Sequence, residues 1–391
     1  MSLSRVKKAI IEVNANGDCV IASMTVRSRL IKGLISIGIE KVFIFDPVGQ
    51  EIDPYTEFAN EKEGQVQQLQ LLDETISDDT IIIEDGIIFH NDVLQAFVAS
   101  DLRAIKDPYN NNLLVSKGTL DQRFDRKELF QIDPFFIFKV DVDNLVEAKK
   151  RLFKYLLKPT DGFVSKHLNR PISTIFSNIL SDYPVVPAYL TGVTALFAVV
   201  MFLALILAEK IGIGWGCFLF HVTSVVDGID GEIARVKFQS TRRGAMLDTT
   251  IDMATNFLFM FGLIFALWDS SGDEYIVKGV IILTLMLTGA ALMYIILYFG
   301  PGGGSFDILS IVIRKKIGKK KDLLRSFVFF NYLLKRDTFA LVFAVLGISG
   351  YAGLIVELLV GGLIIWNVAI ILNARSIIRI GKDNLNMKKL V

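Results

Sequence analysis

The stretch "DGIDGEIARVKFQSTRRGAMLDTTID", from Asp227 to Asp252, places four aspartates where one long apolar segment ends and the next begins. Residues three and four apart on a helix share a face, so Asp227, Asp230, Gly231 and Ala234 form one stripe. Two carboxylates beside two small residues leave room for a ligand.

Gly244, Asp248 and Asp252 are spaced by four and form a similar stripe on the following helix. The short basic turn from Lys237 to Arg243 brings the two stripes together in antiparallel helices. We therefore expect four carboxylates to converge near the cytoplasmic face of a membrane.

Clustered carboxylates at membrane depth repel one another unless a cation binds them. Oxygen ligands suit Mg²⁺, Mn²⁺ or Ca²⁺, and two such ions about 3.5–4 Å apart are a known arrangement for phosphoryl displacement. The alternative is a solvated loop in which the acids pair with neighbouring arginines and lysines. That alternative explains any single aspartate as well as a metal does, but it explains all four together poorly.

Apolar residues dominate the chain, with 52% hydrophobic residues and 29 phenylalanines among 391. Membrane spans of about 20 residues are therefore expected. They are predicted near 185–208, 211–235, 245–268, 276–299, 337–349 with some preceding residues, and 352–374. The fifth is the least regular, because Lys335, Arg336 and Asp337 interrupt it.

The basic connections "KFQSTRR" and "RKKIGKKKDLLR" and the basic end "RIGKDNLNMKKL" contrast with the acidic connection "DSSGDEY". This asymmetry predicts an integral membrane protein whose N-terminal domain and aspartates face the cytoplasm. The start, "MSLSRVKKAI", does not resemble a cleaved signal. Neither the net charge of +1 nor the two cysteines, Cys19 and Cys217, indicate a nucleic-acid binder, a disulfide framework or a zinc site.

The first 140 residues alternate short β-branched runs with helix-like segments, which predicts an α/β domain with a largely parallel sheet. Residues 141–183 are predicted to be a linker and an amphipathic juxtamembrane helix. Residues 184–391 are predicted to be an all-α polytopic membrane domain of about six transmembrane helices.

The patterns DxxDGxxAR at Asp227–Arg235 and GxxxDxxxD at Gly244–Asp252 resemble the complete signature of the CDP-alcohol phosphotransferases. The resemblance implies an enzyme that transfers a substituted phosphoryl group from a CDP-linked donor to an alcohol and releases CMP. It implies that Asp227, Asp230 and Asp248 are ligands of Mg²⁺ or Mn²⁺, with two ions bound. Asp252 would be both a ligand neighbour and the general base.

The resemblance also implies that Gly231, Ala234 and Gly244 accommodate the cytidine diphosphate. Arg235 would contact a phosphate or, as we favour slightly, hold neighbouring carboxylates by ion pairs. "PAYLT" keeps the Pro and Thr of a family element but has Ala188 in place of Asn, and Thr191 is a candidate nucleotide contact.

Basic residues that could bind an anionic acceptor, such as an inositol phosphate or glycerol phosphate, are Lys237, Arg242, Arg243, Arg314, Lys315 and Arg336. Positive-inside topology and lipid headgroups explain most of them more simply. His221 is expected to be a packed helix residue. Glu357 and Asn367 indicate an oligomer contact or a helix–helix hydrogen bond. The family resemblance favours a homodimer in the lipid bilayer.

The N-terminal domain resembles parts of the sugar-phosphate nucleotidyltransferase fold but lacks a Gly-rich phosphate loop, having only Gly17 in that region. It is therefore expected to be inactive, with Asp85 as its one candidate metal residue. The donor of the transferase is expected to be CDP-diacylglycerol or CDP-inositol. Two other functions stay open: a non-catalytic membrane scaffold that binds cation or nucleotide, and the membrane half of a pathway to a di-inositol-phosphate osmolyte with CDP-inositol as donor.

Overall fold

The computed structural model describes residues 6–46, 65–69, 76–77, 79–109, 112–118, 128–131, 133–155, 161–207, 209–299 and 335–389. The chain divides into two compact units. The first comprises Met1–Lys158, Phe176–Val185 and Glu232–Gln239, and the second comprises Pro159–Ile175, Val186–Gly231 and Ser240–Val391. Helices α5 (Arg170–Leu180) and α7 (Glu209–Val236) each contribute residues to both units.

A six-stranded sheet in the order β5-β4-β1-β6-β9-β8 forms the centre of the first unit. Its parallel strands are β1 (Lys8–Glu12), β4 (Lys41–Phe45), β5 (Val66–Leu69) and β6 (Thr80–Glu84). Strands β9 (Leu113–Lys117) and β8 (Ala104–Lys106) are antiparallel to their neighbours. The sheet is thus mixed rather than largely parallel, because the short connection from β8 to β9 can join only antiparallel strands.

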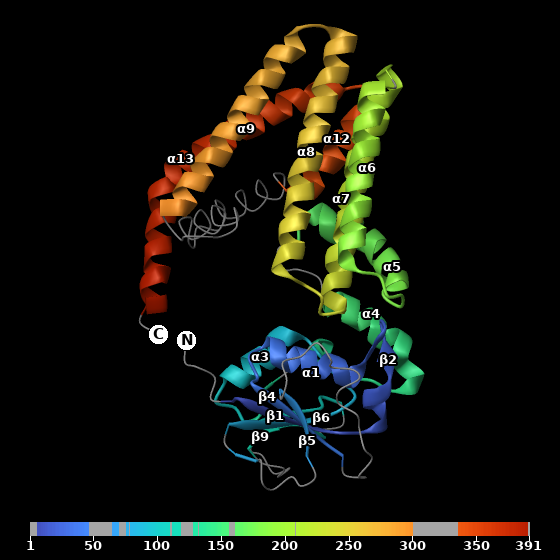
Figure 1. Ribbon diagram of the computed structural model, residues 1–391, viewed down its shortest axis with the longest axis vertical. Helices are drawn as coiled ribbons and strands as arrows, with labels where there is room; N and C mark the ends of the chain where they lie inside the picture. The colour runs from blue at the N-terminus through green and yellow to red at the C-terminus, as the bar shows by residue number, and fades with distance from the viewer. Residues whose placement is uncertain are drawn as a thin grey trace. The chain divides into compact units, whose positions relative to one another are not determined.

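Helices α1 (Val26–Ser36) and α3 (Asn91–Ala99) lie beside this sheet (Figure 1). Thr25 caps α1 by accepting a hydrogen bond from the Ser28 amide. The helices bury Leu34 and Phe97 in the same apolar core as the central strands. The remaining elements are η1 (Ala15–Asp18), β2 (Val20–Ile21), β3 (Met24–Thr25), β7 (Ile87–Phe89), η3 (Pro134–Phe136), β10 (Ile137–Lys139), η4 (Val142–Asn144) and α4 (Leu145–Tyr155).

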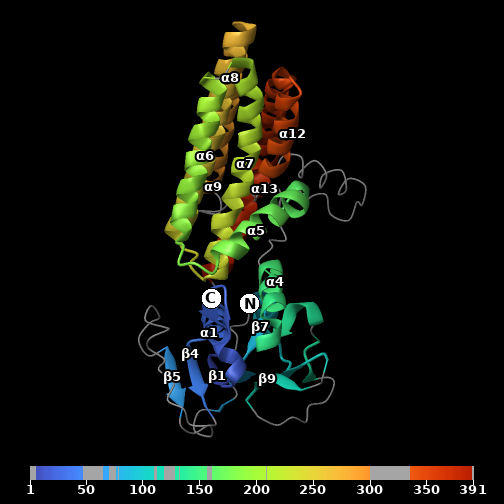
Figure 2. The same ribbon diagram turned by 90° about the vertical axis from the view of Figure 1, so that its right-hand side faces the viewer.

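The second unit is helical (Figure 2). Besides η5 (Ser165–Asn169) and parts of α5 and α7, it contains α6 (Pro187–Leu207), α8 (Arg242–Ser271), α9 (Glu274–Phe299), α12 (Arg336–Ile348) and α13 (Ala352–Lys389). Five segments are long and apolar enough to cross a membrane: Pro187–Leu207, Ile211–Val236, Arg243–Ser271, Glu274–Ile296 and Ala352–Ser376. The protein is therefore a multi-pass membrane protein.

The described residues contain five candidate spans, fewer than the six expected from the sequence. The difference lies at α12, which has 13 residues. At 1.5 Å per residue such a helix is about 20 Å long, less than the roughly 30 Å of a bilayer core. Residues 300–334, which precede it and would have to lengthen it, lie outside the described part of the chain.

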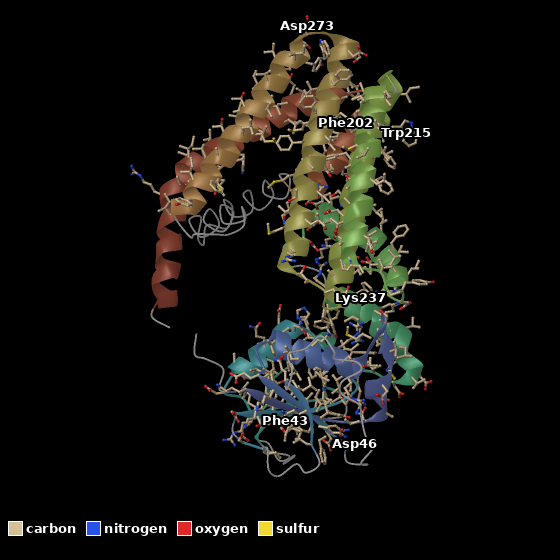
Figure 3. The ribbon with its side chains drawn as sticks, viewed as in Figure 1. Phe43, Asp46, Phe202, Trp215, Lys237 and Asp273 are labelled. Atoms are coloured by element: carbon tan, nitrogen blue, oxygen red, sulfur yellow. The ribbon has the colours of Figure 1, made fainter. Side chains whose placement is uncertain are left out.

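Aromatic stacking and a small residue pack the spans closely. A side chain at Gly262 of α8 would meet Leu205 and Phe202 of α6 at about 3 Å, so glycine permits this approach. Phe202 is labelled on α6 in Figure 3. Phe220 of α7 stacks on Phe259 of α8 with ring centroids 4.0 Å apart. Close helix packing is what positions the polar groups described below.

Helices α9 and α13 run side by side (Figure 1). The Asn367 side chain on α13 donates a hydrogen bond of 2.9 Å to the Leu285 carbonyl on α9. Glu357 on α13 also pairs with Lys278 on α9 at 2.7 Å. The sequence suggested an oligomer contact or a helix–helix hydrogen bond for these two residues. In the structure both residues form contacts between helices of the same chain.

Candidate functional site

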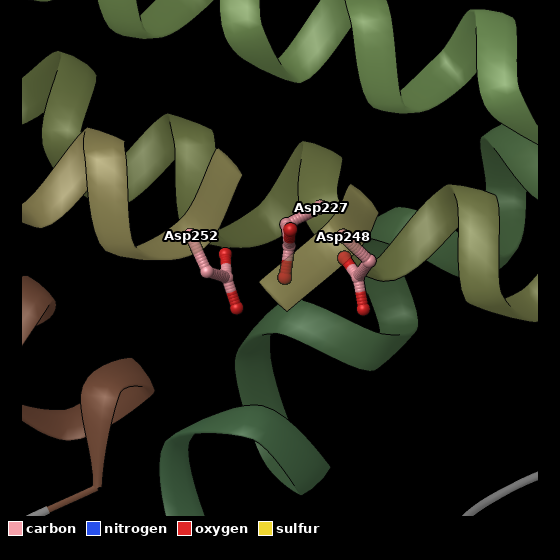
Figure 4. Close-up of side chains that lie close together, drawn as sticks. All are labelled: Asp227, Asp248 and Asp252. Atoms are coloured by element: carbon pink, nitrogen blue, oxygen red, sulfur yellow. The ribbon is translucent and has the colours of Figure 1, made fainter. Parts of the chain in front are cut away.

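Three aspartates converge from two helices. Asp227 on α7 and Asp248 and Asp252 on α8 each offer a carboxylate oxygen, and these oxygens all lie within 4.8 Å of one another (Figure 4). All three residues are half-buried. Hard oxygen donors at this spacing fit a divalent cation such as Mg²⁺ or Mn²⁺. This cluster, the aspartate triad, has the composition of a metal site.

Asp230, the fourth aspartate of the signature, lies outside the triad. Only 5% of it is exposed, and its Oδ2 lies 2.5 Å from the Thr191 hydroxyl of α6. That hydroxyl is also 3.2 Å from the Pro187 carbonyl. Three residues advance a helix by about 300°, which turns Asp230 roughly 60° away from Asp227 and towards α6. Thr191 therefore contacts an aspartate of the signature.

Arg336, at the start of α12, brings positive charge to the triad. Its Nη1 contacts Asp252 Oδ1 and lies 3.6 Å from Asp227 Oδ2. Its Nε and Nη2 are buried and make no hydrogen bond within the described residues. A divalent cation would add to this positive charge and offset the mutual repulsion of the three carboxylates.

A cavity of about 340 Å³ opens beside Asp227 and Asp252. Its wall combines these carboxylates with cationic and hydroxyl side chains. The other residues that line it are Asp161, Gly162, Ser165, Asn169, Arg170, Ser173, Ser224, Val225, Gly228, Lys335, Arg336 and Asp337. Three cationic side chains beside a candidate metal centre make a suitable environment for phosphate groups.

An ion pair fixes Arg170 in the cavity wall. Its Nε and Nη2 donate to the two carboxylate oxygens of Asp161 at 3.0 and 3.2 Å, and both side chains are nearly buried. A Cβ at Gly228 of α7 would lie 3.3 Å from Arg170 Nη1 and 3.5 Å from Ser173 Oγ. Glycine at 228 therefore allows Arg170 to approach α7 one residue from Asp227.

Asp337 ties the start of α12 to the opposite wall. Its Oδ2 accepts a hydrogen bond of 2.6 Å from the Ser165 amide. A Cβ at Gly162 would come within 2.4 Å of the same oxygen, so this position requires glycine. The contact holds the neighbouring Arg336 beside the triad. The sequence offered only a weak signal for these residues: Asp161 and Arg170 stand beside a glycine and a proline, and Asp337 is a charge that interrupts an apolar segment.

The remaining signature residues occupy the ends of the two helices. The Gly244 amide donates to Thr241 Oγ1 at 2.9 Å, which caps α8. Gly231, Ala234 and Arg235 are half-buried along the last turns of α7. The expected contact of these residues with the cytidine diphosphate stays a prediction.

The other candidate residues are distributed as follows. Lys237 is buried and donates to the Tyr183 carbonyl, whereas Arg243 is exposed. His221 is buried on α7 and is not a member of the triad. Arg314 and Lys315 lie outside the described residues, as does the side chain of Arg242.

Asp85 in the first unit has entirely different surroundings. It is fully buried, and its Oδ2 accepts a hydrogen bond of 2.6 Å from Arg27 Nε. Arg27 also donates to Asp18 at 2.6 Å. Burial works against the charge of Arg27, but these two carboxylates raise the pKa of its guanidinium. A Cβ at Gly17 would lie 1.8 Å from Asp85 Oδ2, so glycine allows the backbone to pack closely against this carboxylate.

The fold and the triad define a multi-pass membrane protein with an acidic centre of metal-binding type. Residues 184–372 match the family described as CDP-alcohol phosphatidyltransferase. The C-terminal half of the chain therefore contains a CDP-alcohol phosphatidyltransferase domain.

Similar proteins include three with the name bifunctional IPC transferase and DIPP synthase. The one from Aquifex aeolicus is 38% identical over 144 residues, covering 36% of this chain and 32% of the relative. The one from Thermococcus kodakarensis is 35% identical over 130 residues, 32% of this chain and 29% of the relative. The one from Archaeoglobus fulgidus is 36% identical over 125 residues, 31% of this chain and 24% of the relative. The matched part thus spans a third or less of each relative.

Proposed function

We propose that the membrane domain transfers a substituted phosphoryl group from a CDP-linked donor to a phosphorylated alcohol and releases CMP. The observation that carries the proposal is the continuity of the aspartate triad with a cavity that presents Arg170, Lys335 and Arg336. The names of the relatives favour CDP-inositol as the donor and an inositol phosphate as the acceptor over CDP-diacylglycerol and glycerol phosphate.

Asp227, Asp230 and Asp248 are the proposed ligands, with Asp252 as ligand and base. Bound Mg²⁺ or Mn²⁺, as two ions, would neutralise charge that develops on the donor pyrophosphate. The donor would lie along Gly231, Ala234 and Gly244, where small residues allow close approach of phosphate oxygens. Asp230 would reach the ions from its hydrogen bond with Thr191.

The chemical step is an in-line displacement at the donor's β-phosphorus. Asp252 accepts the proton of the acceptor hydroxyl, and the hydroxyl oxygen forms a new bond to phosphorus. The bond between that phosphorus and the oxygen that bridges it to CMP breaks, and CMP leaves with the electron pair. The cationic wall would hold the acceptor's own phosphate, with Arg170 kept in place by Asp161.

The first experiment measures CMP release by the purified full-length protein with Mg²⁺ or Mn²⁺. CDP-inositol, CDP-diacylglycerol and CDP-glycerol are each paired with inositol phosphate, glycerol phosphate, inositol and serine. We expect release from one pairing, dependent on metal and absent in Asp248→Asn. Metal binding without release from any pairing would contradict transferase activity and favour the scaffold.

The role of the cationic wall is tested with the acceptor. Asp161→Asn combined with Arg170→Gln removes both buried charges together, which avoids leaving one unpaired. We expect the acceptor KM to rise by about 10- to 100-fold, because a hydrogen bond to a charged group contributes about 1.5–3 kcal/mol. Arg103→Gln, at an exposed arginine of the first unit, is the matched control. An acceptor KM equal to that of the wild type would exclude Arg170 from acceptor binding.

We further propose that the first unit has no nucleotidyltransferase activity, because Arg27 already neutralises Asp85. The predicted boundaries at residues 140 and 183 are retained, with the segment between them as a linker and a helix at the membrane surface. That placement suits α5, whose serines Ser173 and Ser177 are buried while Ile175 and Ile179 are exposed. A homodimer with cytoplasmic active sites remains a prediction.

A further inference from the structure

The guanidinium of Arg29 is buried, and in the part of the chain that the structure describes it contacts backbone carbonyls rather than a carboxylate. Only 5% of Arg29 is exposed. Its Nε donates to the Ile21 carbonyl at 3.2 Å, its Nη2 donates to the carbonyls of Ile21 and Ala22, and its Nη1 donates to the Val236 carbonyl. Burial lowers the pKa of the guanidinium to about 9, so it stays protonated at neutral pH. Burying a charged group costs free energy unless hydrogen bonds compensate for it, so the contacts of Arg29 with these carbonyls are important for the structure.

Val236 is the last residue of α7. The carbonyls at a helix C-terminus have no partner within the helix, and the helix dipole makes that end negative. Arg29 supplies both a donor and a positive charge there. Lys237, labelled in Figure 3, is also buried and donates to the Tyr183 carbonyl. Phe238 then adopts the left-handed conformation, with φ of 53°, and ends the helix.

A strained turn directs the other two carbonyls at Arg29. Ala22 and Ser23, between β2 and β3, have φ angles of 51° and 56°, a region that residues with side chains rarely adopt. The Ser23 hydroxyl donates to the Ser181 carbonyl at 2.9 Å. Turn, arginine and helix end all belong to the first unit, and Val236 and Ser181 are buried. The unfavourable backbone conformation of Ala22 is retained where its carbonyl makes a buried hydrogen bond with Arg29. This indicates that the position of the α7 end is constrained.

We propose that Arg29 is a positioning residue for phosphoryl transfer, acting through the end of α7. Asp227 lies nine residues before Val236 on the same continuous helix, about 14 Å along its axis. The chain after Val236 reaches α8, which carries Asp248 and Asp252, within six residues. Holding the Val236 carbonyl fixes where the turn between the two signature helices begins. The proposal rests on the proposed function and gives the α/β unit a role without catalysis.

The test compares two buried arginines of α1 in the full-length protein. Arg29→Met releases the end of α7. The control, Arg27→Met with Asp85→Asn, removes a buried arginine whose partners all lie elsewhere in the α/β fold. Steady-state kinetics give kcat and both KM values, and manganese titration followed by electron paramagnetic resonance gives metal affinity without turnover.

We expect Arg29→Met to lower kcat at least tenfold and to weaken Mn²⁺ binding severalfold, with KM changed less than threefold. Arg29→Lys keeps the charge but reaches fewer carbonyls, so it should lie between Arg29→Met and the wild type. The control should keep kcat within twofold even where its melting temperature falls. If Arg29→Met does not fold, Arg29→Lys decides by the same criteria.

The proposal is overturned if folded Arg29 variants keep the kcat and Mn²⁺ affinity of the wild type, or if the control loses as much of both. Failure of the proposed function looks different: the wild type itself would release no CMP from any donor. In that case Mn²⁺ affinity still tests Arg29, because the affinity reports the geometry of the triad directly.

Discussion

Each unit holds an acidic centre, and the two centres have opposite surroundings. Asp85 is a single, fully buried carboxylate that Arg27 neutralises at 2.6 Å. The triad brings three half-buried carboxylates together beside a cavity, and the guanidinium of Arg336 contacts Asp252. A buried aspartate paired with an arginine stabilises the fold, whereas several carboxylates clustered beside a cavity can bind a metal ion.

The largest expected effect is on the chemistry at the triad. Asp252→Asn keeps the side-chain shape but removes the base, so kcat for CMP release should fall about 10²- to 10⁴-fold. Donor binding, measured by calorimetry, should persist. If Asp252→Asn kept more than a tenth of the wild-type kcat, the base would have to be another group.

The same change at Asp85 should affect stability instead. Asp85→Asn removes one of the two carboxylates that lie 2.6 Å from the buried Arg27, and breaking a buried pair costs up to about 3–5 kcal/mol. Denaturant unfolding followed by the circular dichroism of the β-sheet measures this loss. Mn²⁺ binding to the variant should match the wild type, and loss of a bound ion would show that Asp85 is a metal ligand after all.

Thr191→Val tests whether Asp230 depends on α6. It removes the hydroxyl next to a buried carboxylate, and a hydrogen bond to a charged group contributes about 1.5–3 kcal/mol. We expect a lower melting temperature together with a severalfold change in Mn²⁺ affinity. Thr194, one turn later on the same helix, bonds only to the Leu190 carbonyl in the described residues, so Thr194→Val is the matched control.

The smallest expected effect concerns close packing beside the cavity. Gly228→Ala adds a methyl group 3.3 Å from Arg170 Nη1, a contact that the arginine can relieve by a small shift. The acceptor KM should rise only two- to fivefold, with kcat nearly unchanged. Gly192→Ala on α6, where no atom lies within 4 Å of the added methyl group, should leave both constants unchanged.

Sequence spacing predicted much of the triad, because four-residue steps place Asp248 and Asp252 on one face whatever surrounds the helix. It could not predict that Asp230 turns towards Thr191. A three-residue step offsets the side chains of Asp227 and Asp230 by about 60° around the helix. Whether Asp230 then faces the metal site or a neighbouring helix depends on how the helices pack. The cavity wall depends on Asp161 and Arg170, which belong to no motif and reach the site only through tertiary packing.

The α/β unit shows the same limit in its sheet. Alternation of strands and helices predicts parallel pairing, and β1, β4, β5 and β6 follow it. The direction of β9 depends on the length of its connection to β8, which short apolar runs do not reveal. The membrane spans were predicted by length, and only α12, with 13 residues, departs from that criterion.

The hydrogen bond from Ser165 to Asp337 also has a consequence for biosynthesis. Its partners lie 172 residues apart. At a translation rate of about 5–20 residues per second, Asp337 follows Ser165 by roughly 10–30 s. A nascent chain that ends after α9 carries the entire signature, yet it lacks the α12 side of the cavity. The first membrane helices therefore insert before the site is complete. A chain with an incomplete site is thus a normal intermediate of synthesis, which the quality-control machinery of the cell would have to tolerate.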